Sequence, residues 1–232
     1  MTTTISSFFL RALSRGRRIL YRAKVERVGA EILRCIDHAG FDREFKNDPE
    51  QQALAGLGSS KYIDLAPWIR ENVDRYFRYG LHRTKPGARV LDLGCGSGFF
   101  LLVCRHFGLQ PLGLDTDLDP LYTRQINFFG LERVEHRIVP GDYLPVFERR
   151  FDLVTAFMIG FNQFPGGATW DTETWLEFLD ELGSTLETGG RALLWFNRYN
   201  DEYYPPDLPG AVARIDRYRA RFFGNCLDLR PK

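Results

Sequence analysis

The most informative stretch of this chain runs Arg89-Val90-Leu91-Asp92-Leu93-Gly94-Cys95-Gly96-Ser97-Gly98-Phe99-Phe100. The apolar run 90–93 predicts a buried strand that contains one acid, and the apolar run 99–104 predicts a helix packed on a sheet. Glycines at alternate positions join the two. A glycine turn lets a ligand approach the backbone closely, because no side chain stands in the way. The stretch therefore predicts a ligand site at the carboxyl end of a strand in an α/β sheet.

The spacing of these glycines distinguishes the turn from other glycine-rich sites. It reads Asp-x-Gly-x-Gly-x-Gly, whereas the dinucleotide fingerprint is G-x-G-x-x-G and the P-loop is G-x-x-x-x-G-K-[ST]. The string Asp92 to Gly98 resembles the first motif of class I S-adenosylmethionine (SAM)-dependent methyltransferases. The resemblance implies a Rossmann-like, mostly parallel sheet with helices on both faces, which binds SAM and releases S-adenosylhomocysteine. Taken alone, the motif leaves open a glycine turn in another nucleotide-binding Rossmann sheet.

Length, composition and charge set the broad class. The 232 residues suit one α/β domain with an elaboration, and 44% hydrophobic with 26% charged residues is typical of a soluble globular protein. A formal net charge of +1 creates no global attraction to nucleic acid. The four cysteines have no metal-ligand spacing, so we expect no metal site and a reduced, cytoplasmic protein. No apolar run approaches the roughly 18 residues of a membrane-spanning helix.

Residues 1–84 are predicted to form an N-terminal helical extension, ahead of a SAM-binding domain over 85–232. Helical spacing covers 25–39 and 62–79, with a polar loop between them. By the family resemblance the extension would act as a lid over the cofactor. Packing or a solvated surface position is favoured for each of its aromatic side chains, and Tyr62 is the one that we select if one of them reaches the cofactor. Residues 2–25 contain basic residues and no acid. A transit peptide or a membrane-surface helix has this composition, but we favour a solvated helix that docks on the domain.

Further acids follow the next two predicted strands. Strand 111–115 ends on Asp115, about twenty residues after the glycine turn, where a Rossmann-type sheet presents a carboxylate to ribose hydroxyls. Asp119 precedes Pro120 and is predicted to cap helix 120–129. After strand 134–139, the resemblance implies that Asp142 and the amide of Tyr143 meet adenine. Alternation along that strand predicts that His136 is a surface residue.

A fourth strand over 151–157 leads into the segment 158–167, which by the resemblance lies beside the sulfonium. The Asn/Asp-Pro-Pro-Tyr/Phe tetrad of enzymes that methylate exocyclic amino groups is missing there. Met158 and Phe161 would form an apolar wall for the acceptor. Asn162 is either the polar group that touches the acceptor or a turn residue. This segment argues against DNA bases and glutamine as substrates.

The C-terminal part is predicted to be shorter than the family pattern. Thr172 would cap a helix that ends at Gly189 in a left-handed cap, followed by strand 191–196. A helix over 211–223 then leaves residues 225–229 for a strand. The expected fold is therefore a Rossmann-like class I methyltransferase sheet with an N-terminal helical extension and a shortened C-terminal strand region.

Ten residues are expected to contact the cofactor, and four are expected to contact the substrate. Cofactor contacts are assigned to Asp92, Gly94, Cys95, Gly96, Gly98, Asp115, Thr116, Asp142, Tyr143 and Phe157. Substrate contacts are assigned to Tyr62, Met158, Phe161 and Asn162. No catalytic residue is assigned, because none of the four histidines lies in a stretch expected to line the site. A general base is needed only if the acceptor enters protonated, and acids or tyrosines of the 201–204 segment could then supply it.

These observations favour a SAM-dependent methyltransferase that acts on a small molecule, with the acceptor atom undetermined. The near-neutral charge and the missing tetrad make nucleic acid the less favoured substrate. The basic N-terminal segment keeps nucleic acid or a membrane surface open as a partner. Two other functions stay open. One is a non-catalytic SAM-binding regulatory or scaffolding protein, and the other, less favoured, is an NAD(P)-dependent oxidoreductase.

Overall fold

A computed structural model describes residues 3–46, 58–163, 167–198 and 203–232 of the chain. The chain divides into two compact units, Met1–Arg83 and Thr84–Lys232. None of the described helices is both long and apolar enough to span a membrane.

The first unit is helical. Its elements are α1 (Thr3–Arg34), α2 (His38–Phe41), a π-helical turn η1 (Asp42–Lys46), a 3₁₀ helix η2 (Gly58–Ile63), α4 (Leu65–Arg78) and a 3₁₀ turn η3 (Leu81–Arg83). The helix predicted over 25–39 is thus part of a helix that begins at Thr3 and stops before Asp37, whose side chain caps α2. The predicted helix 62–79 corresponds to the end of η2 and to α4.

Helices α1 and α4 pack antiparallel to each other. Tyr21 donates a hydrogen bond to the Asp74 carboxylate (2.9 Å), and further along α1 Glu26 pairs with Arg70 (2.8 Å). From the first contact to the second, the residue number rises on α1 and falls on α4, so the two helices run in opposite directions. The apolar faces beside these contacts are buried, with Val25 and Val28 on α1. Apolar residues at helical spacing therefore explain this pair.

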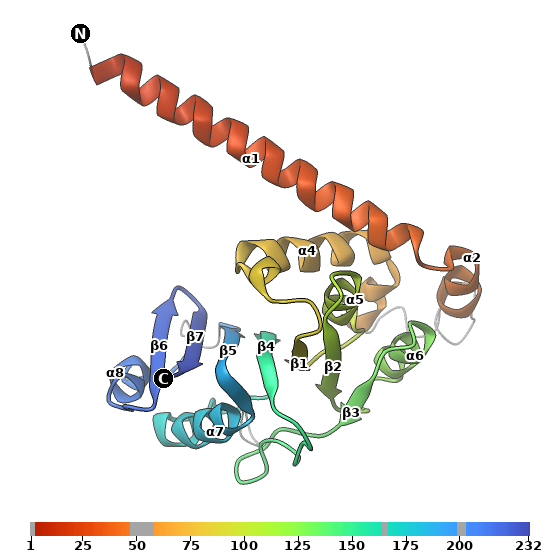
Figure 1. The fold of residues 1–232 in the computed structure, drawn as a ribbon. Coiled ribbons are helices and arrows are strands. Elements are labelled where there is room, and N and C mark those ends of the chain that lie inside the picture. Colours follow the sequence, from red (N-terminus) through yellow and green to blue (C-terminus); the bar gives the residue numbers. More distant parts are fainter. Residues whose placement is uncertain (1–2, 47–57, 164–166, 199–202) are drawn as a thin grey trace. The chain divides into compact units, whose positions relative to one another are not determined.

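The second unit is built around a seven-stranded sheet in the order β3-β2-β1-β4-β5-β7-β6 (Figure 1). The strands are β1 (Arg89–Leu93), β2 (Gln110–Asp115), β3 (Arg133–Glu135), β4 (Phe151–Ile159), β5 (Leu186–Phe196), β6 (Tyr218–Phe223) and β7 (Cys226–Pro231). The helices are α5 (Phe99–His106), α6 (Pro120–Phe128), α7 (Thr172–Ser184) and α8 (Leu208–Ala213). Strands β1 to β5 run parallel, and β7 pairs antiparallel with both β5 and β6. This is the predicted Rossmann-like sheet.

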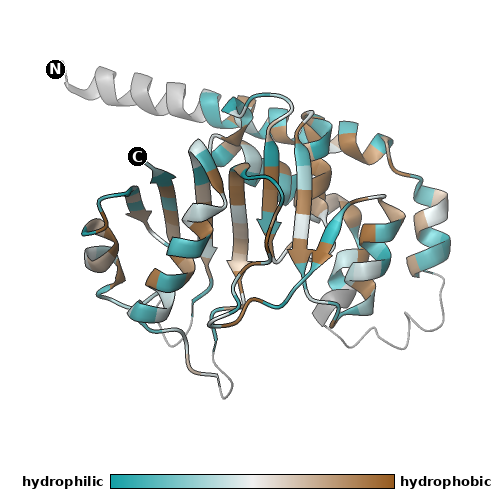
Figure 2. Ribbon diagram, turned by 60° about the horizontal axis from the view of Figure 1, so that its bottom comes forward, coloured by the Kyte–Doolittle hydropathy of each residue, from teal (hydrophilic) through white to brown (hydrophobic). Residues whose placement is uncertain are grey.

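Helices cover both faces of the sheet. On β4, Val154 and Ala156 belong to the same buried cluster as Trp175 of α7. Phe157 meets Phe100 of α5 instead, with ring centroids 4.9 Å apart. Successive strand residues point to opposite faces, so α7 and α5 lie on opposite sides. Apolar residues gather on the strands and on the helices, while most connecting loops are hydrophilic (Figure 2).

The prediction of a shortened C-terminal strand region was wrong, and so was the helix over 211–223. Helix α8 ends at Ala213, and Tyr218–Phe223 forms the edge strand β6. The sequence signal for this hairpin lies in Gly224-Asn225, a two-residue turn with Gly224 at φ 59°, between the paired residues Phe223 and Cys226. The helix-forming arginines and alanine of this segment concealed a strand pattern with a period of two.

Two predicted caps were also wrong. Asp171, rather than Thr172, caps α7, because its carboxylate accepts from the backbone N–H of Thr174 (2.9 Å). Gly189 does not end that helix, which stops at Ser184. Gly189 instead lies inside β5 with φ 78°, where the pairing with β4 shifts register between Phe151 and Leu153. Extra residues in one of two paired strands form a β-bulge, and a left-handed glycine suits it. In contrast, Asp119 caps α6 as predicted.

We predict that Gly183→Ala destabilises the second unit by about 1–3 kcal/mol, the usual cost of overpacking. A Cβ at Gly183 of α7 would overlap the ring and hydroxyl of Tyr218 on β6. Urea unfolding of the full chain measures this change. Gly210→Ala on α8 is the matched control, because a Cβ there meets no atom within 4 Å.

Tyr218→Leu should cost less stability in the Gly183→Ala background than in the wild-type chain, since it removes the overlapping ring. Equal unfolding midpoints for the Gly183→Ala and Gly210→Ala variants would contradict the predicted packing of β6 on α7.

Candidate functional site

The glycine turn lies at the carboxyl end of β1 and is tied to the neighbouring strand β2. The backbone N–H groups of Gly94 and Cys95 donate to the carbonyl of Leu114 at 2.8 and 3.3 Å. Gly94 has φ 70°, and a Cβ there would meet no atom within 4 Å. The left-handed backbone explains the choice of glycine at this position, and the open space beside it leaves the backbone accessible to a ligand.

Asp115 completes the link between the turn and β2. Its carboxylate accepts from the N–H of Gly96 at 2.6 Å and from the N–H of Thr116 at 2.7 Å. Burial raises the pKa of the Asp115 carboxyl above its usual value, although these two hydrogen bonds and the charge of Arg133 act in the opposite direction. Ionisation of this acid therefore costs folding stability as the pH rises through the raised pKa.

Asp92 sits deeper in the sheet than Asp115. It is buried on β1 and accepts a hydrogen bond from the hydroxyl of Thr155, its neighbour on β4 (2.7 Å). Cys95 is also buried, in a small cluster with Leu101 and Ile126, and burial raises the pKa of its thiol. Both side chains therefore face the protein interior next to the turn.

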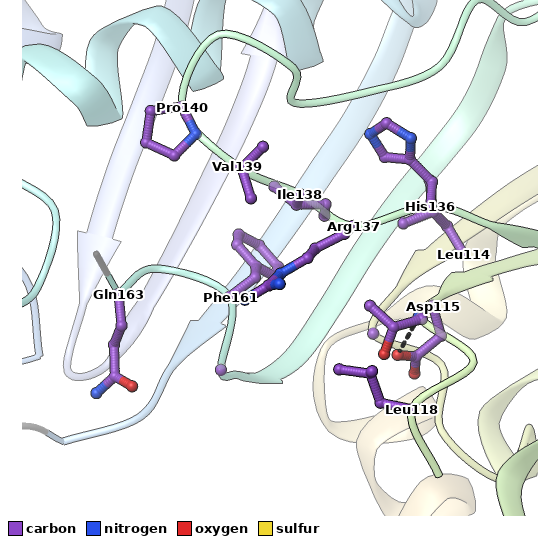
Figure 3. A pocket seen from close by; sticks show the side chains of 13 residues that line it. Leu114, Asp115, Leu118, His136, Arg137, Ile138, Val139, Pro140, Phe161 and Gln163 are labelled. Carbon is purple, nitrogen blue, oxygen red and sulfur yellow. Dashed lines mark hydrogen bonds between the residues drawn. The ribbon is translucent and has the colours of Figure 1, made fainter. Parts of the chain in front are cut away.

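A cavity of about 820 Å³ opens beside the turn, at the carboxyl ends of the strands. Its size falls within the roughly 300–1,000 Å³ of typical small-molecule sites. Figure 3 shows the side chains that line it. They come from the ends of β1 and β2, from the segment that follows β3 and from the segment that follows β4: Gly94, Leu114, Asp115, Thr116, Leu118, His136, Arg137, Ile138, Val139, Pro140, Gly160, Phe161 and Gln163. The carboxyl edge of the parallel strands thus holds a pocket, as such sheets do at their ligand sites.

Four of the residues predicted from the sequence line this cavity, namely Gly94, Asp115, Thr116 and Phe161. Most of the other lining residues were missed. Residues 136–139 were expected to continue β3, but the strand ends at Glu135. A non-strand segment after a short edge strand has no periodic sequence signal, so its side chains could not be assigned to the pocket.

The prediction that His136 is a surface residue away from the site was wrong. His136 lines the cavity, and its side chain is 15% exposed. Its Nε2 lies 3.2 Å from the carbonyl oxygen of Asp142 and 3.7 Å from a carboxylate oxygen of the same residue. Alternation predicts an outward side chain only while the chain remains extended, and His136 follows the last residue of β3.

Neither of the residues expected at adenine lines the cavity. The side chain of Asp142 is 71% exposed, and its backbone N–H is bonded to the carbonyl of Val139 (3.0 Å). Tyr143 is buried, and its hydroxyl donates to Glu177 on α7 at 2.9 Å. Burial, and to a smaller extent the hydrogen bond to Glu177, raises the pKa of Tyr143 to about 12. Tyr143 therefore anchors this loop to α7, and a role of either residue toward adenine stays a prediction.

The end of β4 is irregular. Met158 has φ 58°, which is a rare conformation for a residue other than glycine, and the pairing with β5 shifts register between Ala156 and Ile159. The Met158 carbonyl accepts from the side-chain amide of Asn197, just beyond β5, at 3.1 Å. The Met158 side chain is 47% exposed. A bulge held in this way beside a pocket is a typical means of aiming side chains at a ligand.

Beyond the bulge, Phe161 and Asn162 differ in surroundings. Phe161 lines the cavity and packs against Trp170 and Phe178, with ring centroids 5.7 and 5.5 Å away. Asn162 is 1% exposed, and its side-chain oxygen has no hydrogen-bond partner within the described ranges. Its backbone carbonyl accepts from the N–H of Trp170 (3.0 Å). Phe161 joins the pocket to the aromatic core beneath it, and Asn162 is buried beside them.

The remaining predicted residues lie elsewhere. Phe157 packs between Phe100 and Trp195 and does not line the cavity. Tyr62 belongs to the first unit, where its ring packs against Trp68 at 4.6 Å. Of the residues considered as a base, 201 and 202 lie outside the described residues. Tyr204 packs between Phe196 and Phe222, so it serves the core of the second unit.

The chain belongs to the class I SAM-dependent methyltransferases, because a family model described as "Methyltransferase domain" matches residues 65–195, more than half of the chain. A tRNA U34 carboxymethyltransferase of Campylobacter curvus is 22% identical over 203 residues, which make up 78% of this chain and 63% of that protein. A ribosomal protein L11 methyltransferase of Cupriavidus necator is 30% identical over 170 residues, 69% of this chain and 47% of that protein. The match therefore spans less than two thirds of either relative.

Among solved structures, DesVI of Streptomyces venezuelae resembles the chain with a TM-score of 0.52 and 14% identity. The alignment covers 85% of this chain and 99% of that one. At this identity the likeness supports the fold alone. The fold and the family agree with the class that the glycine turn indicated.

The site has features that suit the cofactor of this family. Gly94 has a left-handed backbone with open space beside it, so a ligand can reach the backbone there. Each oxygen of the Asp115 carboxylate accepts one backbone hydrogen bond and has a second lone pair, which suits the two hydroxyls of a ribose. The cavity beside them is mostly apolar, which suits a nucleoside base. These observations fit SAM.

We predict that Asp115→Ala weakens SAM binding about 10- to 100-fold, because a hydrogen bond to a charged group contributes about 1.5–3 kcal/mol. Isothermal titration calorimetry measures this change. Asp117→Asn is the matched control, since Asp117 lies outside the cavity and pairs with Arg133. Circular dichroism must show that both variants are folded. Unchanged SAM affinity in a folded Asp115→Ala variant would exclude the ribose role.

The wild-type affinity should also fall as the pH drops through the raised pKa of Asp115, because the protonated acid is a poorer acceptor. This loss should begin at a higher pH than for an ordinary aspartate, and the Asp115→Ala variant should lack it.

Proposed function

We propose that the protein transfers a methyl group from SAM to a small-molecule acceptor. The observation that supports this most is the cavity of about 820 Å³ beside the glycine turn, because it is a concave, largely apolar site rather than an open surface. It is bounded by residues that follow β4, where this class of fold receives the acceptor. None of the four described cysteines forms a disulfide, which favours a reducing compartment, and we assign the protein to the cytoplasm.

In this proposal the three acids Asp92, Asp115 and Asp142 serve the amino-acid end, the ribose and the adenine of SAM in turn. Asp115 is the best supported of them, because it lines the cavity. Asp92 would act from below the turn, where it is bonded to Thr155. Asp142 would have to turn its exposed side chain towards the pocket to accept from adenine.

When bound, SAM supplies a methyl group that is already activated by its positively charged sulfur. The protein then has to hold the acceptor in line and exclude water, and correct orientation contributes roughly 7–11 kcal/mol to such reactions. We assign the apolar wall of the acceptor site to Phe161, which lines the cavity, and to Met158 at the end of β4. Asn162 stays a proposed acceptor contact, because its buried side-chain oxygen has no hydrogen-bond partner within the described ranges.

RNA is a second candidate acceptor. One curated relative is named for tRNA U34, and α1 carries Arg17, Arg18 and Arg22 in exposed positions. Basic side chains on one helix favour contact with phosphates. The near-neutral net charge of the chain weighs against RNA, so we rank it second.

We predict that methyl-labelled SAM labels the small-molecule fraction of a cell extract, and that the RNA and protein fractions stay at background. The three fractions are incubated separately with the full chain and counted. An Asp115→Ala sample is the control for binding-dependent transfer. Labelled RNA or protein would replace the small-molecule acceptor with the corresponding polymer. SAM binding without label in any fraction would favour the non-catalytic, SAM-binding alternative.

A further inference from the structure

The cavity contains a cation that the proposed handling of SAM does not use. Arg137 lines the cavity in the segment after β3, and no hydrogen bond or ion pair holds it within the described part of the chain. Its side chain extends into the pocket in the direction of Phe161 (Figure 3). Phe161 follows β4, so the guanidinium is directed towards the side of the cavity assigned to the acceptor.

Other arginines of the second unit are committed to the protein itself. Arg133 pairs with Asp117 (3.1 Å), Arg191 pairs with Asp228 (2.9 Å), and Arg105 donates to the carbonyl of Phe129 (2.8 Å). These contacts fix strands and helices to one another. Arg137 has no such structural task in the described residues, and it is an exposed residue that lines a largely apolar cavity.

The charges around Arg137 leave its guanidinium available to a ligand. The acid that lines the same cavity is Asp115, and both of its oxygens accept from backbone N–H groups. Asp115 lies beside Leu118 in Figure 3, apart from the end of the Arg137 side chain. The other titratable lining residue, His136, is bonded to the carbonyl of Asp142. A planar guanidinium in this setting suits bidentate contact with a carboxylate or a phosphate.

We infer that Arg137 determines the class of acceptor, and that the acceptor is a small molecule carrying an anionic group, a carboxylate or a phosphate. This inference rests on the proposed function and narrows it. Arg137 holds the anionic group, while the apolar wall around Phe161 receives the part of the molecule that is methylated.

The test uses the full chain and a small-molecule extract that is divided on an anion-exchange resin at pH 7. We expect methyl-labelled SAM to label the retained, acidic fraction and to leave the flow-through fraction at background. Arg137→Gln should lower the rate per amount of acidic fraction about 10- to 100-fold, the usual effect of losing one charged hydrogen-bonding partner. Arg137→Lys should lose less, because it keeps the charge without the planar fork.

Arg149→Gln is the matched control, since Arg149 is exposed and does not line the cavity. It should transfer label at the wild-type rate. Label in the flow-through fraction, or a wild-type rate for Arg137→Gln on the acidic fraction, would overturn the inference while leaving methyl transfer to small molecules intact. No label in either fraction would instead defeat the proposed function.

A binding measurement excludes the other anion that Arg137 could hold, the carboxylate of SAM itself. Calorimetry compares SAM with 5′-methylthioadenosine, which lacks the amino-acid end. The inference requires Arg137→Gln to leave both affinities within about twofold of the wild type, less than the loss of one ordinary hydrogen bond. Selective weakening of SAM would assign Arg137 to the cofactor carboxylate, and equal weakening of both would assign it to the adenosine. Either result overturns the proposed acceptor contact.

Discussion

The bond between the Asp115 carboxylate and the N–H of Gly96 is the contact on which the site depends. It joins the glycine turn after β1 to the end of β2, next to the backbone bonds from Gly94 and Cys95 to Leu114. Glycine adopts many backbone conformations with similar ease, so the glycines alone do not fix the conformation of the turn. The bonds to β2 select one conformation, and they also bury the acid, which raises its pKa. The same carboxylate thus organises the turn and faces the cavity.

Parallel pairing explains why distant parts of the chain meet around this acid. β1, β2 and β4 run in the same direction, so the segments that follow them emerge at one edge of the sheet. β3 is short, and the chain after it crosses to the same edge, where it brings His136 and Arg137 to the cavity. The site is therefore assembled from four loops on a rigid base, which is how open α/β sheets form ligand sites.

The pairing between β4 and β5 is irregular at two places, one near each end of β4. Gly189 has a left-handed backbone near the start of β5, and Met158 has one near the end of β4. Glycine adopts this conformation without strain, whereas methionine does so only when its surroundings require it. The hydrogen bond from Asn197 to the Met158 carbonyl is one such constraint. Both positions shift the register of a central strand pair, and the one at Met158 lies beside the pocket.

The local sequence pattern was sufficient to predict features that depend on the chemistry of a particular residue type. In each of three features, a particular residue type suits one local conformation, and the structure contains all three. They are the acid and glycines of 92–98, the acid at the end of β2 and the helix cap at Asp119. The C-terminal hairpin was missed because good helix formers in 211–223 outweighed the short Gly224-Asn225 turn. Propensity is a weak prior, and pairing with a neighbouring strand overrides it.

The sequence by itself determined the family, the parallel strands of the sheet and the acid at the end of β2 that lines the cavity, because those depend on residues close together in the chain. Only the tertiary structure decided which side chains line the pocket. His136 and Arg137 follow a three-residue edge strand, and no periodic pattern extends past its end. Tyr143 and Phe157 were placed by packing against α7 and α5, away from the cavity. Side-chain direction at such points depends on contacts between segments far apart in the chain, and those contacts exist only once the sheet has formed.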